Sequence, residues 1–333
     1  MLVRLLKTGL ALLLTVACAP APASPAAKPA SVPALAELNI DYAYYSPTSL
    51  VLKRMGWVEE AFKPQNTTVK WVLSAGSNKA IEYLSGNAVD FGSTAGAAAL
   101  LAKTNDVPIK AVYIYEQPEW TALVVGKESA VKDPKELKGK KIAATKGTDP
   151  YFFLLRTLNA NGLSQADVEV VNLQHDQGRL ALERGQVDAW AGLDPHMAAS
   201  ELEAGSKLLY RNKDFNTYGF LNAREAFLSQ YPDATRKVIE QYEKARQWTI
   251  EHPDEAAKIL SEESQVSLDV AKRELFERMN LKSSAVPGDE HITALEAVIP
   301  IMKAEKLVKD GSDPDKALAD LIEPGFAKAV VGQ

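Results

Sequence analysis

The sequence predicts an α/β protein of two lobes, each a mainly parallel sheet flanked by helices, with a helical C-terminal tail packed on the first lobe. Three observations predict this fold. Short β-rich runs alternate with helical segments from Leu38 onward, as in parallel sheets covered by helices. The alternation starts again after Glu116, and from Arg224 the pattern is nearly all helical. The 333 residues are enough for two such lobes.

Residues 1–18 are predicted to be a lipoprotein signal peptide. Two basic residues precede the apolar run Leu10–Ala17, which is too short to span a bilayer. A small residue stands before Cys18, the only cysteine of the chain, as lipoprotein processing requires. We therefore expect lipidation of Cys18. The alternative is an ordinary leader that is cleaved a few residues later.

Residues 19–37 are mostly Ala, Pro and Ser, and this composition predicts a disordered tether. No later apolar run approaches the length of a membrane span, so we expect an exported protein held at the periplasmic or outer face of the membrane by its lipid anchor alone. The formal net charge is −5, and Lys and Arg are scattered, which argues against nucleic acid as a partner. We expect a monomer.

The first series of elements alternates from residue 38 to residue 115, and each strand is a short apolar run bounded by turn residues. The pattern predicts strand Leu38–Asp41, helix Thr48–Met55, strand Val69–Leu73, helix Ile81–Gly86, strand Asp90–Gly92, helix Ala95–Lys103 and strand Ile109–Tyr115.

The second series contains one clear helix stop, Asn161-Gly162, where glycine is expected as the left-handed cap. The pattern predicts strand Thr121–Val125, helix Pro134–Lys138, strand Lys141–Ala144, helix Tyr151–Asn161, strand Val168–Leu173, helix Gln177–Arg184, strand Val187–Ala191, helix Pro195–Ala204, strand Lys207–Tyr210 and return strand Thr217–Asn222.

The two series predict a discontinuous first lobe, residues 38–118 and 219–333, around a second lobe of residues 119–218. The chain would cross between the lobes near 116–121 and 215–218. Two crossings predict a hinge, and a hinge predicts a cleft that closes on a ligand. A single large doubly wound sheet is the alternative.

Turns of Gly, Ser and Thr follow three predicted strands, at residues 74–77, 92–94 and 146–148. In open α/β sheets the ligand crevice lies at the carboxyl ends of the strands. A helix N-terminus there offers free N–H groups, and a Ser or Thr hydroxyl adds a donor. The three turns together predict a site for an oxyanion without a metal, although each alone could be an ordinary helix cap.

Three segments carry a family resemblance: Pro134–Ala143 with Lys146–Thr148, Val89–Thr94, and Arg184–Trp190 with Asp194-Pro195. In consistent order they resemble the aliphatic sulfonate, taurine and nitrate binding proteins of ABC importers. The resemblance implies a type II periplasmic-binding fold that closes on a small organic anion, most closely an alkanesulfonate, and hands it to an ABC permease and its ATPase. Taurine or another zwitterion, nitrate, and a thiamine-pyrimidine precursor are alternative ligands.

Carried over position by position, the resemblance implies a ligand shell from both lobes. It comprises Tyr45, Ser46, Ser74, Gly76, Ser93, Thr94, Gly147, Thr148, Trp190 and Asp194. Tyr45 and Trp190 could wall an organic tail, or they could be ordinary packing aromatics. Asp194 could instead cap the helix that Pro195 begins.

Glu119 and Asp149 depart from the family pattern, which has small or neutral residues at these positions. Carboxylates beside an anion site repel the anion unless a ligand amine or a nearby cation offsets them, and Lys146 and Arg179 are candidate cations. We therefore add Glu119, Lys146 and Asp149 to the candidate site and predict a ligand that carries both an acid and a donor or amine, as taurine does. The alternative is that both acids are solvated rim charges.

An enzyme is not expected, and we predict no catalytic residue, metal or cofactor. Related folds with enzymatic activity use cysteines, and Cys18 lies in the leader. The four histidines show no zinc-type spacing. His175-Asp176 could act as a polarised pair, but no Ser nucleophile on an elbow motif accompanies it. A ligand sensor of the same fold is the third functional class.

Overall fold

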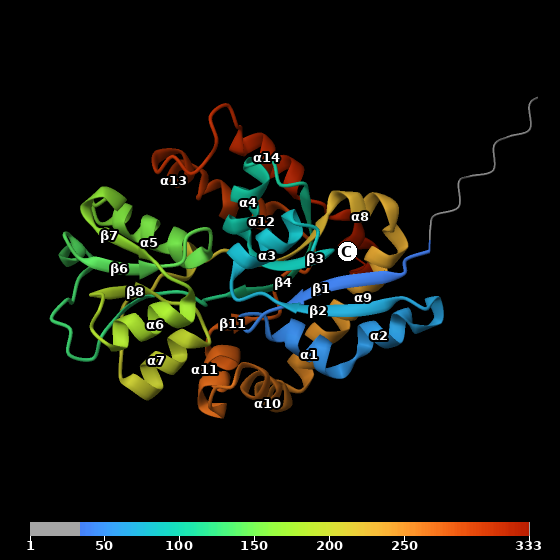
Figure 1. Cartoon of the computed structure of the whole chain (residues 1–333), viewed down its shortest axis with the longest axis horizontal. Helices are drawn as coiled ribbons and strands as arrows, with labels where there is room; N and C mark the ends of the chain where they lie inside the picture. The colour runs from blue at the N-terminus through green and yellow to red at the C-terminus, as the bar shows by residue number, and fades with distance from the viewer. Residues whose placement is uncertain (1–33, 333) are drawn as a thin grey trace, which may run out of the picture. The chain divides into compact units, whose positions relative to one another are not determined.

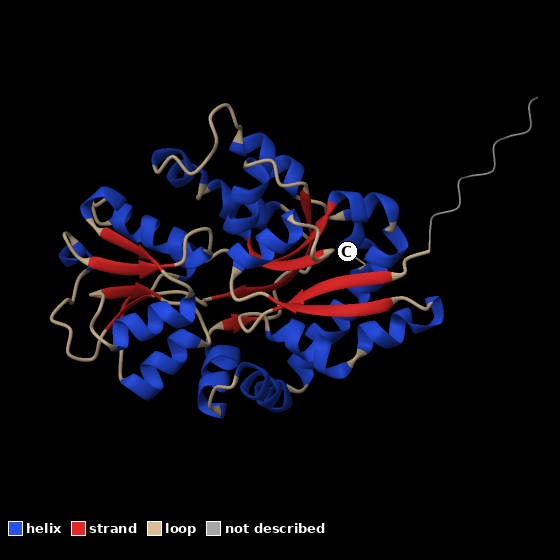
Figure 2. Cartoon of the chain, in the orientation of Figure 1, coloured by secondary structure: helices blue, strands red, loops and turns tan. Residues whose placement is uncertain are grey.

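The computed structural model describes residues 34–332, and this part of the chain is built on two sheets (Figures 1 and 2). The six-stranded sheet has the order β11-β4-β10-β3-β1-β2, and the five-stranded sheet has the order β7-β6-β8-β5-β9. We call the parts around them lobe 1 and lobe 2. The predicted α/β fold of two lobes is confirmed. The predicted signal peptide, Cys18 and all but the end of the predicted tether lie outside the described residues.

Lobe 1 follows the predicted order, and the strands β1, β2 and β3 pair in parallel. Its elements are β1 (Glu37–Tyr42), α1 (Pro47–Met55), α2 (Trp57–Phe62), the 3₁₀ helix η1 (Lys63–Gln65), β2 (Thr68–Leu73), α3 (Ser77–Ser85), β3 (Phe91–Ala95), α4 (Gly96–Thr104) and β4 (Ile109–Pro118). The sequence did not predict α2. It follows α1 directly, because Gly56 at φ 66° ends one helix and begins the next.

One predicted turn is wrong. Residues 92–94 were expected to form a turn after a strand, but they lie inside β3. They pair there with the antiparallel return strand β10 (Gly219–Arg224), with Ser93 opposite Leu221 and Thr94 opposite Phe220. The small polar residues resembled a turn, but pairing with β10 holds them extended.

Lobe 2 also follows the predicted order, and β6 pairs in parallel with β7 and β8. Its elements are β5 (Leu123–Val125), η2 (Pro134–Leu137), β6 (Lys141–Ala144), α5 (Asp149–Ala160), η3 (Gln165–Asp167), β7 (Glu169–Asn172), α6 (His175–Glu183), β8 (Ala189–Ala191), α7 (His196–Ala204), β9 (Lys207–Tyr210) and η4 (Lys213–Phe215). Gly162, at φ 74°, adopts the left-handed conformation predicted after the helix.

The chain passes from lobe 1 to lobe 2 between Pro118 and Leu123 and returns between Tyr210 and Gly219. The two connections lie side by side, because the Thr121 N–H donates to Asn216 Oδ1 over 3.0 Å. The predicted domain boundaries and a bending motion at these connections stay predictions.

The tail packs mainly on lobe 1, as predicted, but it also contacts lobe 2. Helices α9 and α10 contact α1, whereas α12 and α14 cover α4 on the other face of the sheet. Helix α11 contacts α7, and α13 contacts α5, so the tail joins both lobes (Figure 1). The tail elements are α8 (Glu225–Gln230), α9 (Pro232–Glu251), α10 (Pro253–Ser264), α11 (Leu268–Glu277), β11 (Met279–Asn280), α12 (Asp289–Glu296), α13 (Ile299–Ala304), α14 (Pro314–Leu321) and α15 (Gly325–Val331).

The side chains of β4 alternate between the two faces of the lobe 1 sheet, which shows why this sheet needs helices on both faces. Tyr113 and Tyr115 point into the core that includes α1 and α9, whereas Ile114 points into the core that includes α4 and α14. Strand residues buried on both faces are typical of a sheet covered on both sides. Within residues 34–332, no helix combines the length and the apolar character needed to cross a membrane.

Candidate functional site

A cleft of about 360 Å³ lies between the lobes, at the carboxyl ends of β1, β2, β7 and β8. This is the position at which ligands bind in open α/β sheets. The cleft is lined by Tyr44, Tyr45, Leu73, Ser74 and Ala75 of lobe 1 and by Gln174, His175, Asp176, Gln177, Leu193, Asp194, Pro195 and His196 of lobe 2. A larger hollow, of about 690 Å³, is lined by lobe 1 alone and holds the ion pair of Lys103 with Asp320.

Tyr45 is a firmly held part of the lobe 1 wall. Its hydroxyl donates to the carbonyl oxygen of Ser93 over 2.8 Å. Its ring meets the ring of Trp120 edge-on, with 5.8 Å between the ring centroids. Ser74 lies beside it, only 1 % exposed, and its Oγ has no hydrogen-bond partner among the described residues. The Ser74 hydroxyl also lies close enough to the buried Asp41 carboxyl to lower the pKa of that group, so a ligand would compete with Asp41 for the Ser74 hydrogen.

The start of α3 meets lobe 2 at Gly76. The φ of Gly76 is 166°, an extended value that any residue adopts, so the backbone does not require glycine there. The available space does require glycine, because a Cβ at this position would lie 2.9 Å from His175 Nε2 and 2.7 Å from Asn78 Oδ1. A Cβ built at Gly147 would lie 3.7 Å from the Cβ of Asn78. The predicted turns at residues 74–77 and 146–148 therefore face each other across the lobes.

His175 presents a hydrogen-bond acceptor to the start of α3. Thr145 Oγ1 donates its single hydrogen to the Leu173 carbonyl over 2.7 Å, so its 3.2 Å contact with His175 Nδ1 must be donated by the imidazole. Nε2 is then unprotonated, and it has no partner in the described part of the chain. Burial lowers the pKa of His175 to about 3, so the ring is neutral at physiological pH.

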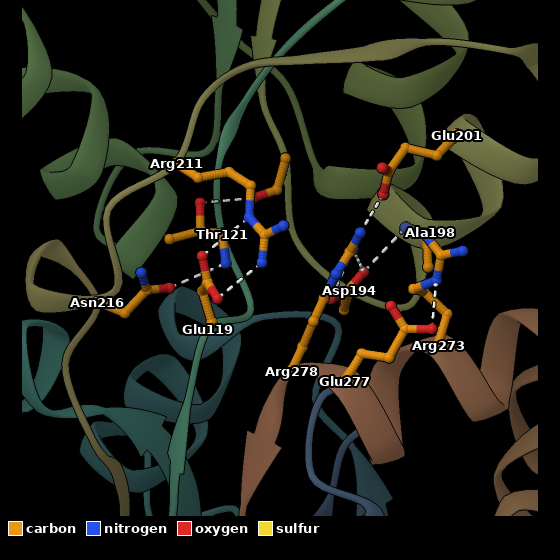
Figure 3. A network of polar contacts seen from close by, with 11 residues as sticks. Glu119, Thr121, Asp194, Ala198, Glu201, Arg211, Asn216, Arg273, Glu277 and Arg278 are labelled. Carbon is orange, nitrogen blue, oxygen red and sulfur yellow. Dashed lines mark hydrogen bonds and ion pairs between the residues drawn. The ribbon is translucent and has the colours of Figure 1, made fainter.

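Asp194 lines the cleft from lobe 2 and pairs with a cation of lobe 1. Arg278, directly after α11, donates through one guanidinium nitrogen to both Asp194 oxygens, over 2.9 and 3.1 Å, and its other nitrogen bonds Glu201 (Figure 3). Asp194 Oδ1 also accepts from the Ala198 N–H at 2.9 Å, which is the helix-capping role offered as an alternative. Burial raises the pKa of Asp194, and Arg278 opposes the rise.

The structure places Glu119 and Asp149 at the connections between the lobes. Glu119 forms two hydrogen bonds with Arg211, over 2.8 and 2.9 Å (Figure 3). Asp149 is 1 % exposed and accepts from Trp120 Nε1 on the outgoing connection and from the N–H and Oγ1 of Thr217 on the return. The interpretation of Asp149 as a solvated rim charge is wrong, because its donors lie on two buried chain connections.

Several other predicted residues lie outside the lining of the cleft. Trp190 is 1 % exposed, lies in the core of lobe 2 and presses its indole against Gly178, the packing role given as the alternative. Thr94 Oγ1 accepts from Asn222 Nδ2 over 2.8 Å, and Thr148 Oγ1 donates to the Thr145 carbonyl over 2.6 Å. Each of these side chains therefore packs or forms its hydrogen bond within its own lobe.

Lys146 is exposed, and its backbone N–H donates to Asn172 Oδ1. Arg179, the second candidate cation, pairs with Glu183 and Glu203, each over 2.7 Å. Neither of these cations is part of the lining of the cleft. Ser46 and Ser93 are buried in lobe 1, and their Oγ atoms have no partner among residues 34–332.

Three carboxyl groups are fully buried behind the lobe 1 wall. Asp41 Oδ1 accepts from the Ser93 N–H over 2.8 Å, but its Oδ2 has no partner within the described chain. Burial raises the pKa of Asp41 to about 7. The pKa values of Glu116 and Glu274 are raised well above the usual range by the same burial.

Replacing Asp41 with asparagine is expected to flatten the dependence of stability on pH. The pKa of Asp41 in the folded protein lies above its unfolded value of 3.8. The contribution of Asp41 to the free energy of unfolding is therefore complete below pH 3.8 and is lost as the pH rises through about 7. The loss is at most about 4 kcal/mol. We expect Asp41→Asn to gain much more stability over the wild type at pH 8 than at pH 4, measured by urea unfolding. Parallel pH profiles would contradict this expectation, and Asp310→Asn serves as the exposed control.

The sequence missed most of the lobe 2 wall. His175 was considered only as half of a catalytic pair, although it begins the helix after β7 and so occupies a strand–turn–helix position like the three that were chosen. Arg278 had no sequence signal, because it lies in the helical tail, 84 residues from Asp194. Among the described residues, no group of His, Cys, Asp and Glu is arranged to hold a metal ion.

Comparisons with known proteins indicate one family for this chain. The family described as NMT1/THI5 like matches residues 34–256. A "Putative aliphatic sulfonates-binding protein" of Bacillus subtilis (strain 168) is 29% identical over 68% of this chain and 70% of its own length. A protein of the same name from Escherichia coli (strain K12) is 31% identical over 47% of this chain and 50% of its own.

The fold is also that of solved binding proteins. The alkanesulfonate-binding protein SsuA from Xanthomonas axonopodis pv. citri, bound to MOPS, matches with a TM-score of 0.78 and 24% sequence identity. The match covers 86% of this chain and 98% of that protein. At this level of identity the similarity shows the fold, which is the predicted one.

Proposed function

Because this chain belongs to the NMT1/THI5-like family, we propose that it is the extracytoplasmic solute-binding component of an ABC importer. Its ligand is a small organic anion, and an aliphatic sulfonate is the first candidate, as the names of the relatives suggest. Taurine or another zwitterion, nitrate, and a thiamine-pyrimidine precursor are the alternatives. The protein binds its ligand without chemical change.

The cleft between the lobes carries this proposal. It has the volume of a small-molecule site, its walls come from both lobes, and its lobe 1 side begins at the N-terminus of α3. The first N–H groups of a helix have no partner within the helix and favour a negative charge. An anion held there by lobe 1 would gain further contacts when lobe 2 closes, and its differential affinity would stabilise the closed state.

The partners follow from this role. The closed protein delivers its ligand to a membrane permease driven by an ATPase, and it acts as a monomer. Export through the signal peptide and a lipid anchor at Cys18 rest on the sequence, since both lie outside the described residues. A ligand sensor remains the second class, and it is distinguished by a signalling protein rather than a permease encoded beside this chain.

Thermal unfolding with and without candidate ligands tests the proposal. A ligand at about 100 times its dissociation constant stabilises a protein by about 2.7 kcal/mol. We therefore expect ethanesulfonate or taurine to raise the melting temperature by roughly 5 °C. The panel includes nitrate and a pyrimidine precursor, with sodium chloride at matched ionic strength as the control. The buffer must contain no sulfonate, which excludes MOPS and its relatives. The absence of a shift with every sulfonate would contradict the proposal.

A further inference from the structure

Four large apolar side chains are exposed among residues 34–332, and all four lie on helices that contact one another. Leu180 of α6, Leu202 of α7, and Leu268 and Phe276 of α11 have exposed fractions of 43, 44, 37 and 47 %. Helix α7 contacts both α6 and α11, and the three helices lie in the lower half of Figure 1. Single exposed apolar residues are normal on a protein surface, whereas residues that gather on one face indicate an interaction surface.

An ion pair brings the apolar side chains of α6 and α7 together. Arg179, next to Leu180 in the chain, pairs with Glu203, next to Leu202, over 2.7 Å. The two leucines therefore lie on adjoining parts of lobe 2.

A second ion pair continues this row onto α11. Arg278, two residues after Phe276, pairs with Glu201, which precedes Leu202 in the chain. Leu202 belongs to lobe 2, whereas α11 packs mainly on α10, which contacts α1 of lobe 1. The row is therefore continuous only while α7 and α11 stay together. A partner that covers the row would stabilise this arrangement of the lobes.

The row of Leu180, Leu202 and Phe276, which we call the apolar row, has an acidic rim. In three ion pairs beside it the carboxyl side chain is more exposed than its cation: 46 against 18 % for Glu203 with Arg179, 17 against 3 % for Glu201 with Arg278, and 60 against 31 % for Glu277 with Arg273. Exposed Asp176 and Arg184, one turn before and after Leu180, balance each other. This surface is complementary to apolar side chains flanked by Lys or Arg.

We propose that the apolar row is the surface through which this protein docks on the extracytoplasmic face of the importer's permease, against apolar side chains flanked by Lys or Arg. This inference rests on the proposed function, which supplies the permease as the partner. A permease that accepts only the ligand-bound protein has to distinguish the arrangement of the lobes, and a surface that spans α7 and α11 depends on that arrangement. A second copy of this chain fits less well, because in a two-fold interface one acidic rim would meet the other.

Stimulation of the importer's ATPase tests the inference. The permease and ATPase are reconstituted together in nanodiscs, and the full chain carrying Cys18→Ser, which lacks the predicted lipidation site, is titrated in saturating ethanesulfonate. We expect Leu202→Ser and Phe276→Ser each to raise the concentration for half-maximal stimulation by about 10-fold or more, because loss of a central apolar contact commonly costs that much affinity. Leu268→Ser, at the other end of α11, is the matched control and should change this concentration by less than about 2-fold.

A change of charge tests the chemistry of the partner. Glu277→Lys should also raise the concentration for half-maximal stimulation, and more so at low salt, because it places a cation opposite the cations of the permease. Asp310→Lys makes the same change of charge on an exposed residue outside α6, α7 and α11, and it should have no such effect. Tighter docking of Glu277→Lys would overturn the proposed basic partner.

The outcomes separate the two claims. If the wild type stimulates the ATPase and the Leu202→Ser and Phe276→Ser variants match it, the inference is overturned and the proposed function stands. If the wild type gives no stimulation with any ligand of the thermal panel, the proposed function fails and the inference fails with it. A wild type that sediments as a dimer, with Phe276→Ser as a monomer, would assign the row to a second copy and overturn the permease as its partner. The melting temperature and ethanesulfonate affinity of each variant check that the fold and the cleft are unchanged.

Discussion

Replacing Gly76 with alanine is expected to weaken taurine binding by about 10-fold or more without unfolding the protein. The extended backbone at Gly76 accepts any residue, and the new Cβ would meet only the end of the Asn78 side chain within lobe 1, which can turn away, so lobe 1 should fold normally. In the structure the new Cβ would lie 2.9 Å from His175 Nε2, closer than van der Waals contact allows. The imidazole is tied to Thr145 and cannot turn away freely, so the lobes must separate. Each 1.4 kcal/mol lost from the closed state costs a factor of ten in affinity.

The matched control is Gly126→Ala, since a Cβ at Gly126 meets nothing within 4 Å. Calorimetry gives the affinity, and small-angle X-ray scattering shows whether the ligand still compacts the protein. We expect Gly76→Val to have the larger effect, because the branched side chain requires more space. Wild-type affinity in a folded Gly76→Ala variant would mean that this contact does not form in the ligand-bound state.

Replacing Arg278 with methionine is expected to lower the free energy of unfolding by about 3 kcal/mol, within the 3–5 kcal/mol typical of breaking a buried pair from one side. The Arg278 side chain is 3 % exposed, and Asp194 opposite it is fully buried. Without the guanidinium, the Asp194 carboxylate is left in the interior with only the Ala198 N–H. Because the pair joins lobe 1 to lobe 2, its loss should also favour an open arrangement of the lobes.

Arg273→Met, within α11, provides the control. Arg273 pairs with Glu277 at the surface, and such a pair contributes at most about 1 kcal/mol (Figure 3). Asp194→Asn added to Arg278→Met should recover part of the loss, because asparagine removes the unpaired charge and can still accept from Ala198. Urea unfolding measures these differences. Additive losses in the double variant would show that the two side chains are not energetically coupled.

The order of elements could be predicted because it depends on local patterns. The strands Lys141–Ala144 and Lys207–Tyr210 have the predicted bounds, since each is a short apolar run between turn residues. The helical tail was recognised from its periodicity alone. Its shortest strand, β11, was not predicted, because two residues carry no periodic signal and pair only through contact with β4.

The site could be predicted only in part. Tyr45, Ser74 and Asp194 line the cleft, and their predicted contact with a ligand stays a prediction. Trp190 and Thr94 do not, because a sequence pattern does not show which face of a buried strand a side chain occupies when both faces are covered. The small turn residues predicted an anion site, but the same residues also serve as helix caps and strand residues.

Local patterns along the chain were enough to predict the α/β series, the restart that makes two lobes, the family and the turns that approach the cleft. These depend on interactions between residues close in the chain. The contact of His175 with Gly76 and the pairing of Arg278 with Asp194 became visible only in the folded molecule. These contacts join residues 84 to 99 positions apart, across the two lobes, and no local pattern in the sequence indicates them.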